Sequence, residues 1–137
     1  MESPAQRLVT QYQNSRAQTP KGEFLQQLVT MLSNRNFNDA TQLLHRYDTN
    51  RFVITQEETA VINAAVEIAK KKLNEKLEDQ GYVSTVGDRR DREDEIRYFN
   101  EDLAKFLNTF AQYQRGESLG LYNAPSPFRY FNFDSST

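Results

Sequence analysis

His45 is the only histidine of the chain, and histidine is the residue type whose ordinary pKa lies closest to neutral pH. Acid–base and nucleophilic catalysis need a second group placed beside the first, yet no carboxylate stands three or four residues before His45. The chain has no cysteine, which excludes thiolate nucleophiles, disulfides and cysteine-ligated metals. We therefore predict a protein that is not an enzyme, with no cofactor, no bound metal and no small-molecule substrate.

Carboxylates are dense between Asp88 and Asp102, but arginines alternate with them. Paired acid catalysis needs a pocket that separates the pKa values of two carboxyl groups, whereas opposite charges four residues apart on a helix form surface ion pairs. We interpret residues 88–95 as a charged helix start that projects beyond the core.

Two runs of positive charge could contact phosphate groups. They comprise Lys70, Lys71 and Lys72, and Arg89, Arg90 and Arg92. If the helices that carry them return antiparallel to each other, both runs lie at one end of the molecule and could form a basic tip. Acidic residues are interspersed, however, and the net charge of -2 gives no general attraction to nucleic acid. A small helical regulatory or nucleic-acid-associated protein is therefore the alternative hypothesis.

Aromatic side chains are concentrated in residues 117–137, which we call the tail. Prolines and glycines exclude a helix there, and disordered segments normally contain few aromatic residues, because each gains about 1.5 to 3 kcal/mol on burial. We therefore expect an extended tail that docks on a protein surface, either on a partner subunit or on the helices of the same chain. The predicted anchors are Tyr122, Phe128, Arg129, Tyr130, Phe131 and Phe133.

The elements that position these residues are all predicted to be helical. One helical domain is expected over residues 1–116, with helices at about 4–17, 20–33, 38–47, 56–80 and 89–115. Helix starts are indicated by Ser3-Pro4, by Thr19-Pro20 and by the capping box from Thr55 to Glu58. The short loop after Gly81 predicts that the last two helices form a long antiparallel hairpin. Residues 51–54 are expected to be a buried connector.

Apolar residues at spacings of three and four indicate which helix faces form the core. The clearest stripe consists of Ile96, Phe99, Leu103, Phe106, Phe110 and Tyr113, with Leu107 beside it. The preceding long helix presents Val61, Ile62, Ala65, Val66, Ile68, Ala69, Leu73 and Leu77, and the first helix presents Ala5, Leu8, Val9 and Tyr12. The chain is therefore predicted to bury one core between its helices.

Three short motifs carry a family resemblance. They are Asn50-Arg51 before a capped helix that contains Glu57, Val61 and Asn63-Ala64, then Val86-Gly87-Asp88, and finally Leu107-Asn108-Thr109-Phe110. Together they resemble the N-terminal helical region of the adenovirus hexon-associated minor capsid protein IIIa, over roughly half of the chain. The resemblance implies a cement protein on the inner face of an icosahedral capsid that bridges penton base, hexons and other minor components. Members of that family are several times longer, and no catalytic residues are implied.

The sequence contains neither the basic start and apolar run of a secretory signal nor about eighteen consecutive apolar residues. We therefore expect an intracellular protein, located in the host nucleus or the virion if it is viral, without a membrane partner. The leading hypothesis is a non-enzymatic structural or interaction protein that cements neighbouring protein subunits of a larger assembly.

Overall fold

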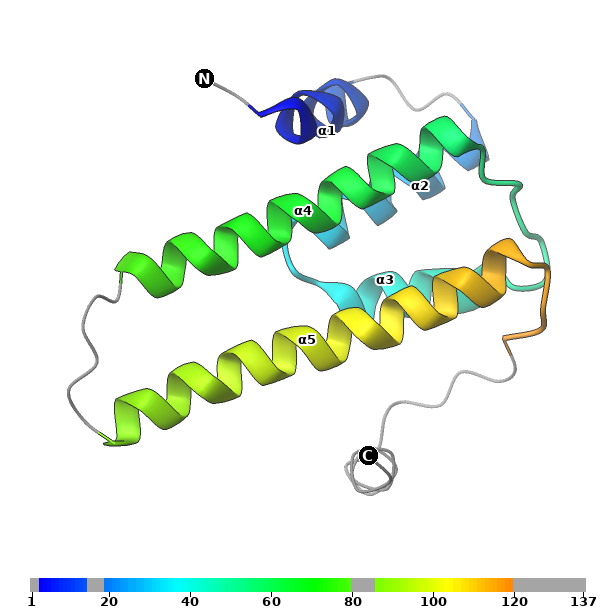
Figure 1. Ribbon diagram of the computed structural model, residues 1–137. Helices are drawn as coiled ribbons and strands as arrows, with labels where there is room; N and C mark the ends of the chain where they lie inside the picture. Colours follow the sequence, from blue (N-terminus) through cyan, green and yellow to red (C-terminus); the bar gives the residue numbers. More distant parts are fainter. Residues whose placement is uncertain (1–2, 15–18, 80–85, 120–137) are drawn as a thin grey trace.

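The computed structural model describes residues 3–14, 19–79 and 86–119, and the regular secondary structure in this part of the chain is entirely α-helical (Figure 1). The helices are α1 (Pro4–Asn14), α2 (Pro20–Ser33), α3 (Phe37–Arg46), α4 (Gln56–Asp79) and α5 (Val86–Gln114). The predicted all-α class is confirmed. The predicted starts of α3 and α5 are one and three residues too late. The prediction treated Asp88 as the residue that caps α5. Aspartate is also favoured in the first turn of a helix, and Asp88 lies in the first turn of α5.

Side-chain caps explain where three of the helices begin. Ser3 Oγ accepts a hydrogen bond from the Gln6 amide at 3.1 Å, and Thr19 Oγ1 accepts one from the Gly22 amide at 3.0 Å. At the start of α4 the capping box is complete, since the Glu58 amide donates to Thr55 Oγ1 at 3.1 Å and the Thr55 amide donates to Glu58 Oε1 at 2.8 Å. These bonds satisfy amides that have no partner inside the helix.

The two long helices run in opposite directions, as Figure 1 shows. Each long helix packs mainly against shorter helices. α4 packs against α1 and α2, whereas α5 packs against α3. The apolar stripes predicted for α4 and α5 are buried, apart from Ile96, which is half-buried, and Leu107, which is 41% exposed. All the helices therefore contribute to one continuous core.

Aromatic rings join α2 to the connector between α3 and α4 and to the end of α5. Phe24 of α2 contacts the rings of Tyr47, Phe52 and Tyr113, with centroid distances of 4.9, 5.3 and 6.1 Å. A second contact joins Phe37 and Phe99 edge to face at 5.1 Å. Aromatic pairs of this geometry stabilise a fold beyond the area that they bury.

Two expectations about burial are wrong. Leu8 is 42% exposed, since α1 packs on α4 and α2 through Val9, Ala5 and Tyr12 instead. In residues 51–54 the side chain of Val53 is 82% exposed, so this connector is only partly buried. The prediction assumed that every apolar residue of this connector is buried. In an extended segment, however, successive side chains point in opposite directions, so only alternate residues face the core.

Candidate functional site

The predicted tail anchors lie outside the described residues, but the first residues of the tail are described. The anchors concerned are Tyr122, Phe128, Arg129, Tyr130, Phe131 and Phe133. Glu117 and Leu119 lie against the connector between α3 and α4, and Leu119 packs on the edge of the core. The helical body therefore holds the base of the tail.

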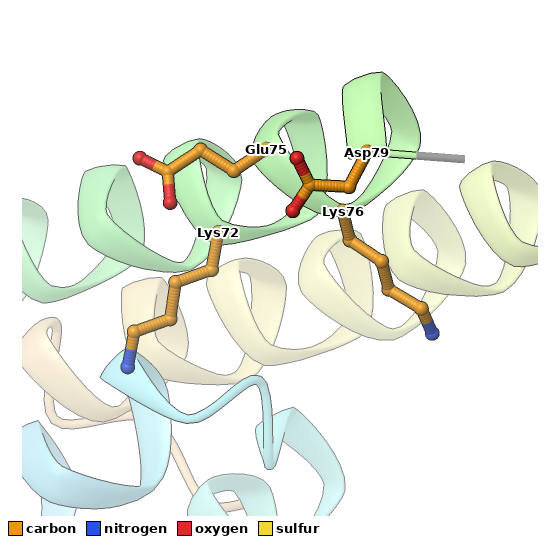
Figure 2. Close-up of a pocket in the computed structure, with 4 residues that line it drawn as sticks. All are labelled: Lys72, Glu75, Lys76 and Asp79. Atoms are coloured by element: carbon orange, nitrogen blue, oxygen red, sulfur yellow. The ribbon is translucent and has the colours of Figure 1, made fainter. Parts of the chain in front are cut away.

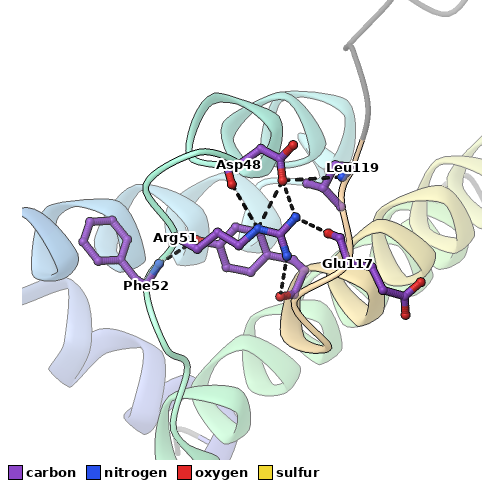
Figure 3. A network of polar contacts seen from close by, with 6 residues as sticks. Asp48, Arg51, Phe52, Glu117 and Leu119 are labelled. Carbon is purple, nitrogen blue, oxygen red and sulfur yellow. Dashed lines mark hydrogen bonds and ion pairs between the residues drawn. The ribbon is translucent and has the colours of Figure 1, made fainter.

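This contact is built around one guanidinium group (Figure 3). Arg51 Nε donates to the carbonyl and to Oδ1 of Asp48, both at 3.1 Å, and Arg51 Nη1 donates to the Tyr113 carbonyl at 3.2 Å. Arg51 Nη2 donates to Asp48 Oδ1 and to the carbonyl of Glu117. The amide of Leu119 donates to the same Asp48 oxygen at 3.4 Å. We call Asp48, Arg51, Tyr113, Glu117 and Leu119 the Arg51 latch.

The latch is partly sheltered from solvent. The side chains of Arg51 and Asp48 are 18% and 21% exposed, and the guanidinium carbon of Arg51 lies 5.1 Å from the ring centroid of Tyr113. Arginine suits this position because its five donors are arranged in a rigid plane that can also stack on an aromatic ring. One side chain thus joins three separate segments of the chain.

Tyr113 anchors the connector from the other side. Its side chain is 3% exposed, and its hydroxyl accepts a hydrogen bond from the amide of Phe52 at 2.9 Å. Burial raises the pKa of the Tyr113 hydroxyl above its ordinary value, because desolvation disfavours the phenolate. The hydroxyl therefore stays protonated, and its role is to hold the connector in place.

The end of α5 directs the chain into the latch. Gly116 has a positive φ of 76°, and its amide donates to the Tyr113 carbonyl at 3.1 Å, while the Glu117 amide donates to the Gln112 carbonyl at 3.0 Å. These two bonds define a Schellman motif, in which glycine is favoured because it adopts the left-handed conformation without strain. The motif turns the chain back so that the Glu117 carbonyl faces Arg51.

The lysines on α4 that were predicted to form part of a basic tip have different partners in the structure. Lys70 and Lys71 are exposed on α4, and Lys71 Nζ lies 4.0 Å from Glu75 Oε1. Lys72 reaches the turn between α2 and α3, where Nζ donates to the Ser33 carbonyl at 3.0 Å and to Asn34 Oδ1 at 3.3 Å. Its charge is therefore directed at the carbonyl end of α2.

On α5, Arg89 and Arg90 are exposed and Arg92 is half-buried. These three arginines make no ion pair with the residues that the structure describes.

An open surface hollow of about 410 Å³ lies on the last turns of α4. It is lined by Lys72, Glu75, Lys76 and Asp79 (Figure 2). Figure 2 shows that the ammonium groups of Lys72 and Lys76 point away from each other. The hollow carries equal numbers of positive and negative groups, so its lining does not favour an anion over a cation.

Glu95 corrects the expectation that the whole charged start of α5 leaves the core. Its side chain is 19% exposed and accepts from Lys76 Nζ at 2.7 Å and from Arg35 Nη1 at 3.2 Å. The hydrogen bond from Lys76, followed by that from Arg35, lowers the pKa of the Glu95 carboxyl group. Glu95 lies on the same helix face as Phe99, a spacing that could have indicated its position. We call Arg35, Lys76 and Glu95 the Glu95 cluster.

Arg35 has an unusual backbone conformation. Its φ is 67°, and the bonds from the Asn36 amide to the Met31 carbonyl at 2.8 Å and from the Arg35 amide to the Leu32 carbonyl at 3.1 Å close a Schellman motif on α2. Glycine usually occupies this position. The guanidinium of Arg35 instead contacts Glu95 and lies 5.5 Å from the Phe99 ring centroid, which links the α2–α3 turn to α5.

The described residues contain no group of three or more histidine, cysteine or carboxylate side chains arranged to hold a metal ion. Within the same residues, none of the helices combines the length and apolar character needed to cross a membrane. Comparisons with protein-family models, with curated proteins and with solved structures found no match for this chain.

Proposed function

We propose that this chain is a non-enzymatic structural protein that binds neighbouring protein subunits of a larger assembly, with the helical body as scaffold and the tail as the binding element. The Arg51 latch is the observation that carries the proposal. It fixes the Glu117 carbonyl and the Leu119 amide to the α3–α4 connector, so the tail leaves the body from a defined point. A fixed origin lowers the conformational entropy that the tail loses on binding.

The composition of the tail supports a protein surface as the target. Phenylalanine, tyrosine and arginine are residue types that often anchor protein interfaces. They make up most of the run from Phe128 to Phe133. The partner chemistry is therefore an apolar surface with acceptor groups for Arg129.

An icosahedral capsid is the assembly that we propose, in agreement with the resemblance to adenovirus minor capsid proteins. In that setting the chain acts as cement between capsid subunits. Lys72 and Lys76 are engaged with the α2–α3 turn and with Glu95, which leaves fewer charges for phosphate groups and favours protein partners over nucleic acid.

The test uses purified adenovirus capsids that lack their minor proteins. The full chain is expected to sediment with these capsids, and replacement of Phe128, Tyr130, Phe131 and Phe133 by serine is expected to lower the bound amount at least tenfold. Tyr98→Ser is the matched control, because Tyr98 is an aromatic residue of the body that is 54% exposed.

Thermal unfolding of the serine variant should match that of the unchanged chain. Equal sedimentation of both chains would refute the tail as the binding element. A serine variant that fails to fold would show instead that the tail completes the core of its own chain.

A further inference from the structure

The N-terminal half of α5 extends beyond α3, the helix against which α5 mainly packs. Phe37, the first residue of α3, meets Phe99 edge to face at 5.1 Å. From that point α3 runs beside the C-terminal half of α5 only, as Figure 1 shows. A helical segment of about a dozen residues is only marginally stable in water without packing partners. The N-terminal half of α5 would therefore gain stability from a neighbouring helix.

Four charged residues share the outer face of this half of α5. Arg90, Asp94, Arg97 and Glu101 are separated by four, three and four positions, a spacing that places them on one side of a helix. Arg90 and Arg97 are exposed, and the side chains of Asp94 and Glu101 are 37% and 22% exposed. We call these four residues the α5 charge face. Their signs alternate along the helix, and their charges cancel.

The α5 charge face is complementary to itself when two copies of the helix run in opposite directions. An axis that passes midway between Glu95 and Ile96 places Arg90 opposite Glu101 of the second copy and Asp94 opposite its Arg97. Two-fold symmetry forms each of these pairs twice. A parallel pair in register would instead place every charge opposite an equal charge, which is unfavourable.

The side chains of this face can take part in such a contact. Arg90 makes no ion pair with the residues that the structure describes. Arg97 lies 3.2 Å from Asp94 and 3.8 Å from Glu101, so a second copy would extend an existing network. Tyr98 borders the face with 54% exposure, and the Arg97 guanidinium carbon lies 5.0 Å from its ring centroid. Tyrosine and arginine often anchor interfaces.

We propose that two copies of this chain associate through their α5 charge faces, with the helices antiparallel and the two-fold axis between Glu95 and Ile96. The contact does not use the tail, so it goes beyond the proposed function and does not depend on it. Exposed ion pairs are individually weak and are screened by salt. We therefore expect a weak dimer that dissociates as the salt concentration rises.

Sedimentation equilibrium of the full chain at low ionic strength, over a range of protein concentrations, measures the association. Arg90→Glu places like charges opposite each other and is expected to raise the dissociation constant at least tenfold. The double variant Arg90→Glu with Glu101→Arg exchanges both signs, so it should restore dimers to within about threefold of the unchanged chain. Lys70→Glu is the matched control, because it makes the same charge change at an exposed position of α4.

The dimer should also form when the serine variant of the tail is used. Loss of the dimer in that variant would assign association to the tail and overturn the proposal. A chain that stays monomeric at every concentration, an Arg90→Glu variant that associates as well as the unchanged chain, or a double variant that stays monomeric would overturn it too. Because Arg90 is exposed, far-ultraviolet circular dichroism of its variant should show unchanged helix content. Failure of self-association would leave the capsid sedimentation test of the tail unaffected.

Discussion

The hydroxyl of Tyr113 and the amide of Phe52 form a 2.9 Å hydrogen bond that joins the last turn of α5 to the connector between α3 and α4. Both groups are sheltered, since Tyr113 is 3% exposed and Phe52 packs on the core. The bond fixes the middle of the connector at Phe52, and the hydrogen bonds of Arg51 fix the preceding residue. The base of the tail depends on both contacts.

Replacing Tyr113 by phenylalanine should remove this bond while keeping the ring. The Phe52 amide would then lose its acceptor in a partly buried position, which costs about 1 to 3 kcal/mol. Urea unfolding measures the difference in free energy. Tyr98→Phe is the control, because the exposed Tyr98 should change stability by less than about 0.5 kcal/mol. An unchanged unfolding midpoint for Tyr113→Phe would contradict the role given to this hydroxyl.

Arg51→Lys should weaken the latch although the positive charge is kept. A lysine ammonium cannot reach Asp48, Tyr113 and Glu117 together, so we expect a loss of roughly 1 to 2 kcal/mol. Faster amide exchange at Leu119 should accompany it. Arg46→Ala serves as the control, because Arg46 is an exposed arginine in the last turn of α3. Slow exchange at Leu119 in Arg51→Lys would show that the backbone alone holds the tail base.

Glu95 makes stability depend on pH in the acidic range. Its pKa is lowered in the folded chain, so its contribution is present above the ordinary value of 4.5 and is lost as the pH falls towards the lower folded value. Glu95→Gln should therefore cost about 1 kcal/mol at neutral pH and progressively less below pH 4.5. Unfolding curves at several pH values measure this difference. A pH-independent difference would exclude the ionised carboxylate as its source.

The backbone of Arg35 can be separated from its side chain with two variants. Arg35→Ala loses the contacts to Glu95 and Phe99 but keeps the strained φ of 67°, whereas Arg35→Gly loses the same contacts and removes the strain. A left-handed conformation costs a residue with a Cβ roughly 1 kcal/mol. We expect the glycine variant to be more stable than the alanine variant by about that amount in urea unfolding. The reverse order would show that φ relaxes after substitution.

Local signals in the sequence predicted the helices well. The caps at Ser3, Thr19 and Thr55 depend on residues three positions apart, and spacings of three and four identified the buried faces of α4 and α5. Such signals need only the geometry of a single helix. The all-α class follows directly from them.

The contacts that make up the candidate site could not be predicted from such local signals. Arg51 and Tyr113 are separated by 62 positions and Arg35 and Glu95 by 60, so neither pair exists until the helices have packed. The charge pattern around Glu95 was interpreted as solvated because its partners come from other helices. Burial of Val53 was predicted from its hydrophobicity. Hydrophobicity alone does not indicate which side of a connector faces the core, and the side chain of Val53 is exposed.

The aromatic cluster around Phe24 gives the protein its own optical probe. The chain has no tryptophan, so its near-ultraviolet signals come from tyrosine and phenylalanine. Tyr47 and Tyr113 both contact the ring of Phe24, and Tyr113 also binds the connector. Two of the seven tyrosines lie in this cluster, so the closure of the connector on α5 contributes to the near-ultraviolet circular dichroism and the tyrosine emission without any attached label.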